Sequence, residues 1–212
     1  TGAVVDASAK GYPARTFWGY QIWAESSSQG GSHGGMGGTQ STTTTTNPVY
    51  GNLFHPDTPG AGGSYGVGGG IVHLNIEETL TVNGDILANA QSNSGSGAGG
   101  SISIQTDILS GQGSISADGG TYTSNSQCGG SGGRIALKGY SVTTGAFAHE
   151  LIATDDWGIR AAGGTGYSSR AGAAGTIFLK SANDVRGTLV ADNKDNNVGN
   201  LTFTVLPTIS SA

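Results

Sequence analysis

The residues best suited to bind a ligand form one short cluster late in the chain. Asp155, Asp156 and Trp157 are consecutive, and Arg160 follows three residues later. An aromatic face beside polar groups could stack on a sugar ring, and paired carboxylates could bind a cation such as calcium. An exposed turn explains the same residues without a ligand, and we favour that interpretation. We expect no cofactor and no metal, because no motif supports calcium.

A second set of polar side chains recurs after apolar-x-Ala units. It consists of Ser8, Asn89, Asp118, Thr154 and Asp192. Lyases and hydrolases of polysaccharides that are built on parallel strands cluster carboxylates with Lys, Arg or calcium. Here only two of the five positions are acidic, and a ladder of polar turn residues explains the column without catalysis. We therefore expect no enzymatic activity, with a carbohydrate-binding or polysaccharide-degrading protein as the alternative.

Nucleophiles and metal ligands give no stronger signal. Cys128 lies in a glycine-rich stretch with no histidine placed to activate it, so a buried thiol is favoured over an intermolecular disulfide. The four histidines, at positions 33, 55, 73 and 149, lack metal-ligand spacing. His33, framed by glycines, is expected to hydrogen-bond crossing backbones or to contribute to a ligand surface. No glycine-rich stretch has the strand and helix context of a nucleotide loop.

Composition excludes several classes of protein. Glycine supplies 40 of 212 residues, and charged residues only 11%, far below the usual quarter. The net charge of −5 argues against nucleic acid, and the short apolar runs argue against membrane insertion. A single cysteine, few lysines and abundant Gly, Ser and Thr indicate an extracellular or cell-surface protein. Asn200 begins an N-glycosylation sequon, which makes it a candidate glycosylation site.

Internal repeats predict the fold. Glycine followed by alternating apolar residues recurs around Val72, Ile102, Ile135 and Ile177, which are 30, 33 and 42 residues apart. Such alternation is typical of half-buried strands. Apolar-x-Ala units form a second register, at residues 5–7, 86–88, 115–117, 151–153 and 189–191. A third register comprises Leu80 with Val82, Ile108 with Leu109, Val142 and Val185. Three short strands per repeat predict an all-β, right-handed parallel β-solenoid.

Glycine-rich excursions follow the apolar-x-Ala units and should lie on one edge of this single domain, residues 1–212. Because glycine lets backbones pass closely, we expect these segments to pack together as a glycine-rich layer. The longest, residues 9–67, contains most of the aromatic residues and is expected to fold over the solenoid, anchored by Trp18 and Trp23. Together with His33 and the cluster at residues 155–157, these tryptophans are the candidate ligand surface. Ice binding is disfavoured, because the threonines gather at residues 42–46 instead of forming a regular face.

The repeat units resemble those of a known group of proteins. The stretch from Val5 to Tyr12, the Gly31–Gly35 element with its Ser-His-Gly-Gly core, and the repeated Gly-Gly-x-Ile and Ile-x-Ala-Asp units carry the resemblance. It is to the glycine-rich β-solenoid modules of very large extracellular proteins in bacteria, algae, protists and plants. Ala9 and Met36 depart from the pattern. The resemblance implies an adhesive or structural module without catalytic residues.

Both ends of the sequence are predicted to form strands. Val5–Ala7 is one, and residues 201–206 are the other, with Leu201, Phe203 and Val205 on one face. Uncapped strands invite pairing with another chain. We therefore expect either a module of a longer solenoid or a filament subunit that joins head to tail with copies of itself. Glycans are a further expected partner.

Overall fold

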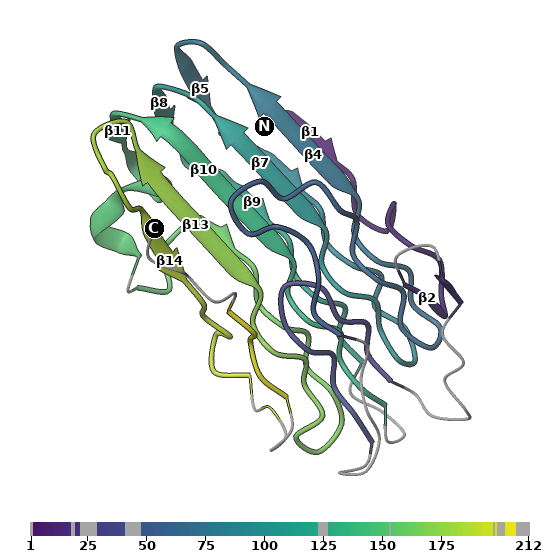
Figure 1. The fold of residues 1–212 in the computed structure, drawn as a ribbon. Coiled ribbons are helices and arrows are strands. Elements are labelled where there is room, and N and C mark those ends of the chain that lie inside the picture. Colours follow the sequence, from purple (N-terminus) through teal and green to yellow (C-terminus); the bar gives the residue numbers. More distant parts are fainter. Residues whose placement is uncertain are drawn as a thin grey trace.

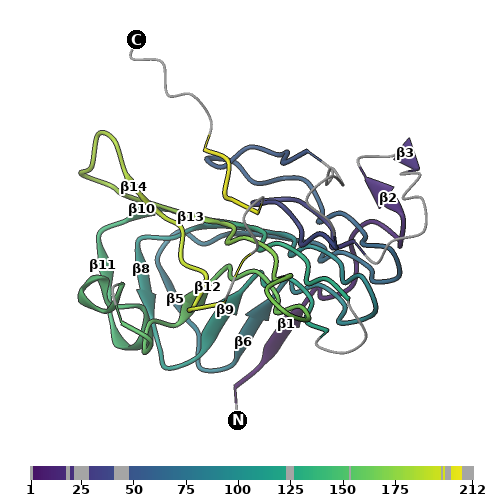
Figure 2. The same ribbon diagram turned by 90° about the horizontal axis from the view of Figure 1, so that it is seen from below.

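The computed structural model describes residues 2–17, 20–21, 29–40, 48–122, 127–152, 154–196, 198 and 202–206. Within these, successive passes of the chain lay short strands side by side in three sheets that surround one core (Figures 1 and 2). All pairings in the three sheets are parallel, except one at the edge of the largest sheet.

The largest sheet contains five strands in the order β14-β13-β10-β7-β4. They are β4 (Ile71–Asn75), β7 (Ser101–Gln105), β10 (Arg134–Tyr140), β13 (Thr176–Ser181) and β14 (Thr188–Val190). The predicted column of Val72, Ile102, Ile135 and Ile177 is confirmed, because these residues are register partners across the sheet. All four side chains are buried in the core.

The second sheet has the order β1-β6-β9-β12 and the third has the order β11-β8-β5. The second comprises β1 (Val4–Asp6), β6 (Asp85–Leu87), β9 (Ser114–Ser116) and β12 (Ile159–Arg160). The third comprises β5 (Thr79–Thr81), β8 (Ile108–Ser110) and β11 (Val142–Thr143). A hairpin of β2 (Thr16–Phe17) and β3 (Tyr20–Gln21) lies apart from them (Figure 2).

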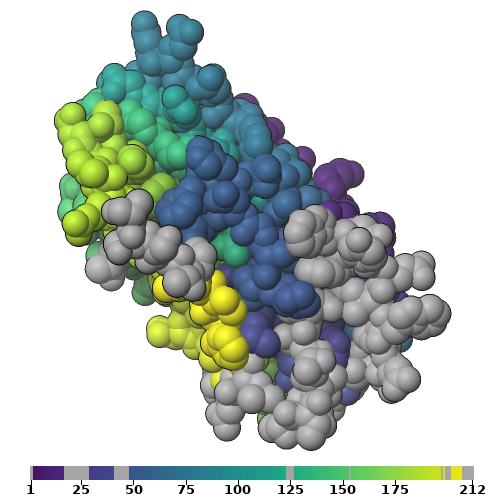
Figure 3. All heavy atoms as spheres, in the orientation of Figure 1, coloured from purple at the N-terminus to yellow at the C-terminus, as the bar shows by residue number. Residues whose placement is uncertain are grey.

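Two 3-10 helices, η1 (Gly145–Phe147) and η2 (His149–Leu151), lie between β11 and β12. Phe147 is buried in the core, and Leu151 and Ile152 pack against it. Residues 48–59 lie on the outer face of the five-stranded sheet (Figure 3), where Leu53 is buried against Ala136 and Phe178.

The prediction of a closed β-solenoid is wrong. The described strands form small separate parallel and mixed sheets, and β14 pairs antiparallel with β13. After β6, β9 and β12 the chain leaves the sheets for glycine-rich stretches that run out and back beside them (Figure 2). These stretches form a second hydrogen-bonded layer, so the prediction that they pack closely as a glycine-rich layer is confirmed.

Backbone hydrogen bonds hold this glycine layer together. The Gly164 N–H donates to the Gly130 carbonyl at 2.8 Å, Gly130 donates to Gly120 at 3.0 Å, and Gly120 donates to Gly97 at 3.0 Å. A Cβ on Gly130 would overlap the Gly97 carbonyl oxygen. Glycine is therefore required here because neighbouring backbones approach more closely than any side chain permits.

Three assignments within the repeats are also wrong. The fourth member of the apolar-x-Ala column is residues 159–161, since Ile159 pairs with Ile115, whereas Leu151 belongs to η2. The unit at residues 189–191 lies in β14 and so in a different sheet. Val185 is no strand residue either, because it is 87% exposed in the turn between β13 and β14.

Candidate functional site

One end of the stack carries three strands with a free edge. β1, β4 and β5 are the edge strands of the three sheets, and all three edges lie on the same side of the molecule (Figure 1). Within the described chain, no strand pairs with their outer edges. A free edge presents backbone N–H and carbonyl groups that can pair with another strand. We call this end, formed by β1, β4 and β5, the open end.

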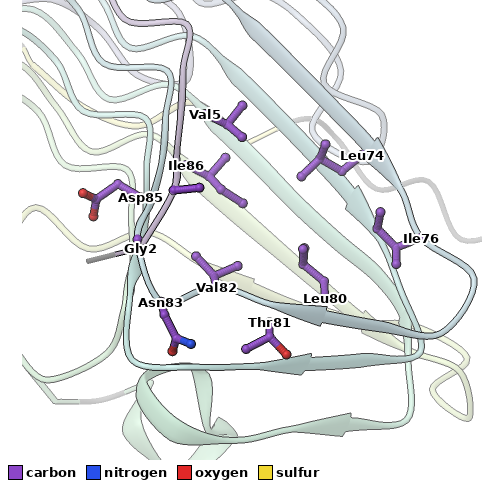
Figure 4. Close-up of a pocket in the computed structure, with 12 residues that line it drawn as sticks. Gly2, Val5, Leu74, Ile76, Leu80, Thr81, Val82, Asn83, Asp85 and Ile86 are labelled. Atoms are coloured by element: carbon purple, nitrogen blue, oxygen red, sulfur yellow. The ribbon is translucent and has the colours of Figure 1, made fainter.

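Apolar side chains are concentrated at the open end. Val4 is 55% exposed and Ile71 is 41% exposed, both on edge strands. A hollow of about 570 Å³ opens between the three edge strands and β6 (Figure 4). The apolar side chains that line it are Val5, Leu74, Ile76, Leu80, Val82 and Ile86. The hydrophobic core therefore continues to the surface here without a cover in the described structure.

The rim of this hollow is acidic. Glu77 and Glu78 are exposed in the turn between β4 and β5. Asp85 lines the hollow and accepts a hydrogen bond from the Ser114 hydroxyl at 2.6 Å. Hydrogen bonds from Ser8 lower the pKa of the nearby Asp6 carboxyl, which stays ionised. The residues that line the hollow include no Lys or Arg.

The opposite end of the stack is covered. Phe147 of η1 is only 1% exposed and packs into the core, and β14 with Val190 packs on the last parallel strand. The two ends therefore differ in kind, because one end exposes the apolar core and the other is closed by the chain itself.

His33 is fully buried at the junction of the glycine layer and the five-stranded sheet. Its Nδ1 lies 2.7 Å from the Gly99 carbonyl oxygen, and its Nε2 lies 3.1 Å from the Thr58 hydroxyl. The predicted hydrogen bonding to crossing backbones is confirmed. Its assignment to a ligand surface is wrong, because no solvent reaches the ring. Burial, and then the charge of Arg134, lower the pKa of His33 to about 3.

Arg134 completes this buried polar cluster. Its Nε donates to the Tyr50 carbonyl at 2.9 Å, and its Nη1 donates to the Thr176 hydroxyl at 3.0 Å. Desolvation lowers the pKa of Arg134 to about 10, so the guanidinium stays charged at neutral pH. The cluster ties residues 29–60 to the sheet, and it has no exposed face on which a substrate could react.

The predicted cluster at residues 155–157 does not form an aromatic binding platform. Trp157 is 6% exposed and belongs to the core, so its face cannot stack on a sugar. Asp155 and Asp156 are exposed, and Asp155 lies 3.5 Å from the Lys194 ammonium. Lys194 also pairs with Asp192 at 3.0 Å. Across the described residues, no three or more acidic, His or Cys side chains are grouped so that they could hold a metal ion.

The polar turn ladder is confirmed for part of its length. The Asn89 N–H donates to the Ser8 hydroxyl, the Asp118 N–H donates to the Asn89 side chain, and the Ala162 N–H donates to Asp118. Thr154 is not the next member. Arg160, which sequence reasoning placed in the ligand cluster, instead donates to Asp118 at 2.6 Å. The Ile-Arg-Ala spacing at 159–161 was the signal that could have revealed this.

Several predicted residues lie outside the described residues: Trp18, Trp23, Asn200 and Leu201. Phe203 and Val205 are described and are 56% and 40% exposed. Residues 202–206 are not assigned as a strand, and the Met36 N–H donates to the Phe203 carbonyl at 3.2 Å. This segment therefore runs beside the glycine layer, and its role in assembly stays a prediction.

No helix among the described residues is long and apolar enough to cross a membrane. Comparison with known proteins gave no matching family model, no similar curated protein and no similar solved structure.

Proposed function

We propose that this protein is a non-enzymatic structural or adhesive module of the extracellular surface, and that it associates end to end through its open end. The observation that carries the proposal is the contrast between the two ends of the stack. Three free edge strands surround an apolar hollow at one end, whereas the chain covers its own core at the other.

Two physical costs favour association at the open end. Each edge strand leaves backbone groups that another strand can pair, and the apolar hollow leaves core side chains in contact with water. Burying apolar surface stabilises an interface by about 25 cal/mol for each Å² removed from water. A neighbouring module or a second copy of the chain would supply both the missing strands and the missing apolar contacts.

The buried polar and thiol groups suit a scaffold better than an enzyme. The buried His33 and Arg134 are engaged with carbonyl and hydroxyl groups of the chain, and the buried Cys128 has a pKa raised by desolvation to about 11. These groups fasten layers together. The composition favours a location outside the cell, where glycans on the chain or on a partner surface are compatible with an adhesive role.

Concentration-dependent sedimentation velocity tests the proposal. The wild-type chain should form species larger than a monomer as its concentration rises. Ile71→Lys puts a charge on the exposed edge of β4 and should weaken association at least tenfold, because edge lysines oppose strand pairing. Val205→Lys, at a similarly exposed apolar position in the segment 202–206, is the matched control.

Each outcome has a defined meaning. Association lost in Ile71→Lys and kept in Val205→Lys supports assembly through the open end. The reverse result would instead assign assembly to the terminal segment around Phe203 and Val205. A monomer at every concentration of wild-type chain would overturn the proposal. Circular dichroism of each variant shows whether the fold is retained.

A further inference from the structure

The proposed end-to-end association raises the question of which surface covers the open end. We infer that it is the β14 side of a second copy, so that β4 of one copy pairs with β14 of the next. This inference rests on the proposed function and names its partner surface. It follows from the sheet order, from the register of the strands and from the charges at the two ends.

The sheet order puts two free edges on opposite sides of the same sheet. β4 is the strand at one edge of the five-stranded sheet, and β14 is the strand at the other edge. β14 pairs on one side with Ile177, Phe178 and Leu179 of β13, and its other edge has no strand partner in the described chain. Stacking two copies along the same direction would bring β4 beside β14 and extend the sheet from one copy into the next. Since β14 runs opposite to β13, that junction would be antiparallel.

The register of the strands fixes which turns meet at such a junction. Asn75, Gln105, Lys138 and Lys180 are successive register partners, so they form one column from the open end to β13. The turn that contains Glu77 and Glu78 begins two residues after Asn75. The turn that contains Arg186 follows Lys180 of β13, and it lies at the edge of the sheet opposite β4. Copies stacked in register therefore place these two turns beside each other.

The two turns carry opposite charge. Glu77 and Glu78 are exposed and acidic, and neither side chain makes an ion pair among the described residues. In the other turn Arg186 is exposed, and the Lys180 ammonium is held by the Val185 carbonyl at 3.3 Å. The Asp184 carboxylate of that turn accepts a hydrogen bond from the Arg186 N–H at 2.9 Å and stays ionised. Lys180 and Arg186 carry two positive charges against this one negative charge, so the turn region is basic by one charge. Complementary charges favour this docking and fix its register.

An apolar side chain accompanies the basic turn. Val185 is 87% exposed, the most exposed large apolar residue in the described chain, and its turn projects beyond the sheets (Figure 2). At the junction it would lie near the turn that follows Ile76, one of the residues that line the apolar hollow. Two open ends that paired through parallel β4 strands would instead bring Glu77 and Glu78 against the same acidic side chains of the other copy. The charges therefore disfavour that arrangement, whereas the head-to-tail junction brings unlike charges together.

A charge-exchange experiment tests the inference. One variant carries Glu77→Lys with Glu78→Lys, and a second carries Lys180→Glu with Arg186→Glu. Each alone should associate about tenfold more weakly at low salt, because like charges then face each other at the junction. Mixing the two variants should restore association in alternating order, because every junction between unlike variants then brings opposite charges together. A chain that carries all four changes should associate like wild type.

The outcomes separate the inference from the proposed function. If the acidic-turn variant weakens association and the basic-turn variant does not, the open end is used but its partner is not the β14 side, which overturns the inference alone. If the four-change chain fails to recover while each variant keeps the wild-type circular dichroism spectrum, the inference is also overturned. Absence of association in the wild-type chain overturns the proposed function. An Asp57→Lys variant, which changes an exposed carboxylate on the outer face of the five-stranded sheet, is the charge control.

Discussion

Acid should destabilise this fold through one buried imidazole. His33 has no exposed surface, and burial lowers its pKa from 6.5 to about 3. The folded protein keeps the ring neutral, whereas the unfolded chain protonates it near pH 6.5. Because the folded pKa of this base is the lower one, its stabilising effect is complete above pH 6.5. It is lost as the pH falls from 6.5 toward 3.

The size of the effect follows from the two pKa values. Each pH unit between them costs about 1.4 kcal/mol of unfolding free energy. Relative to pH 7, the loss attributable to His33 is about 2 kcal/mol at pH 5 and about 3 kcal/mol at pH 4. Hydrogen bonds lower the pKa of Asp6 and Asp184 below 3.8, so these groups act at lower pH. Burial raises the pKa of Asp118, which opposes the acid effect in every variant alike.

Urea unfolding at pH 7, 5 and 4, followed by tryptophan fluorescence, measures this effect. His33→Gln should lower stability at pH 7, because it changes the hydrogen bonds to Gly99 and Thr58, but it should remove the loss between pH 7 and pH 4. His149→Gln, which changes an exposed ring, should keep that loss. Equal pH dependence in wild type and His33→Gln would refute the assignment of the acid effect to His33.

Three further results are expected. Gly130→Ala should lower the free energy of unfolding by about 3 kcal/mol or more in thermal unfolding, because the new Cβ overlaps a carbonyl oxygen. Gly139→Ala should lower it by only about 1–2 kcal/mol, because the nearest atom is 3.5 Å away and only the strain of a positive φ remains. Equal losses would contradict the close packing of the glycine layer. Burial raises the pKa of Cys128 to about 11, so a thiol reagent at pH 8 should label only urea-unfolded protein, and rapid native labelling would oppose this. Phe147→Ala should cost about 3–5 kcal/mol in urea unfolding, and a loss under 1 kcal/mol would show that η1 does not cover the core.

The strand columns could be predicted because alternation reports burial directly. Val72, Ile102, Ile135 and Ile177 share glycine on one side and alternating apolar residues on the other, and they form one column in the sheet. The same logic failed at Leu151 and at Val185. A 3-10 helix and an exposed turn can contain the same short apolar patterns as a strand, so only tertiary contacts distinguish them.

The glycine layer and the open end were harder to predict. The abundance of glycine predicts a closely packed layer, but backbone-to-backbone hydrogen bonds such as Gly164 to Gly130 leave no side-chain pattern that would predict which segments pair. Val5 could be recognised as part of an uncapped strand. Predicting the hollow would require the positions of Leu74, Leu80 and Val82 relative to one another, and these depend on how the three sheets meet. Trp157 was misassigned because an aromatic residue beside two aspartates has the same sequence whether its ring faces solvent or the core.

Electron microscopy of wild-type filaments tests end-to-end assembly most directly. Five strands cross the largest sheet, and adjacent strands lie about 4.8 Å apart, so copies joined through β4 and β14 would repeat every 24 Å or so along the filament. We predict head-to-tail filaments with an axial rise of about 24 Å per subunit, with the five-stranded sheet continuous across each junction. Particles that stay monomeric at high concentration, or that pair through a two-fold axis, would contradict the account.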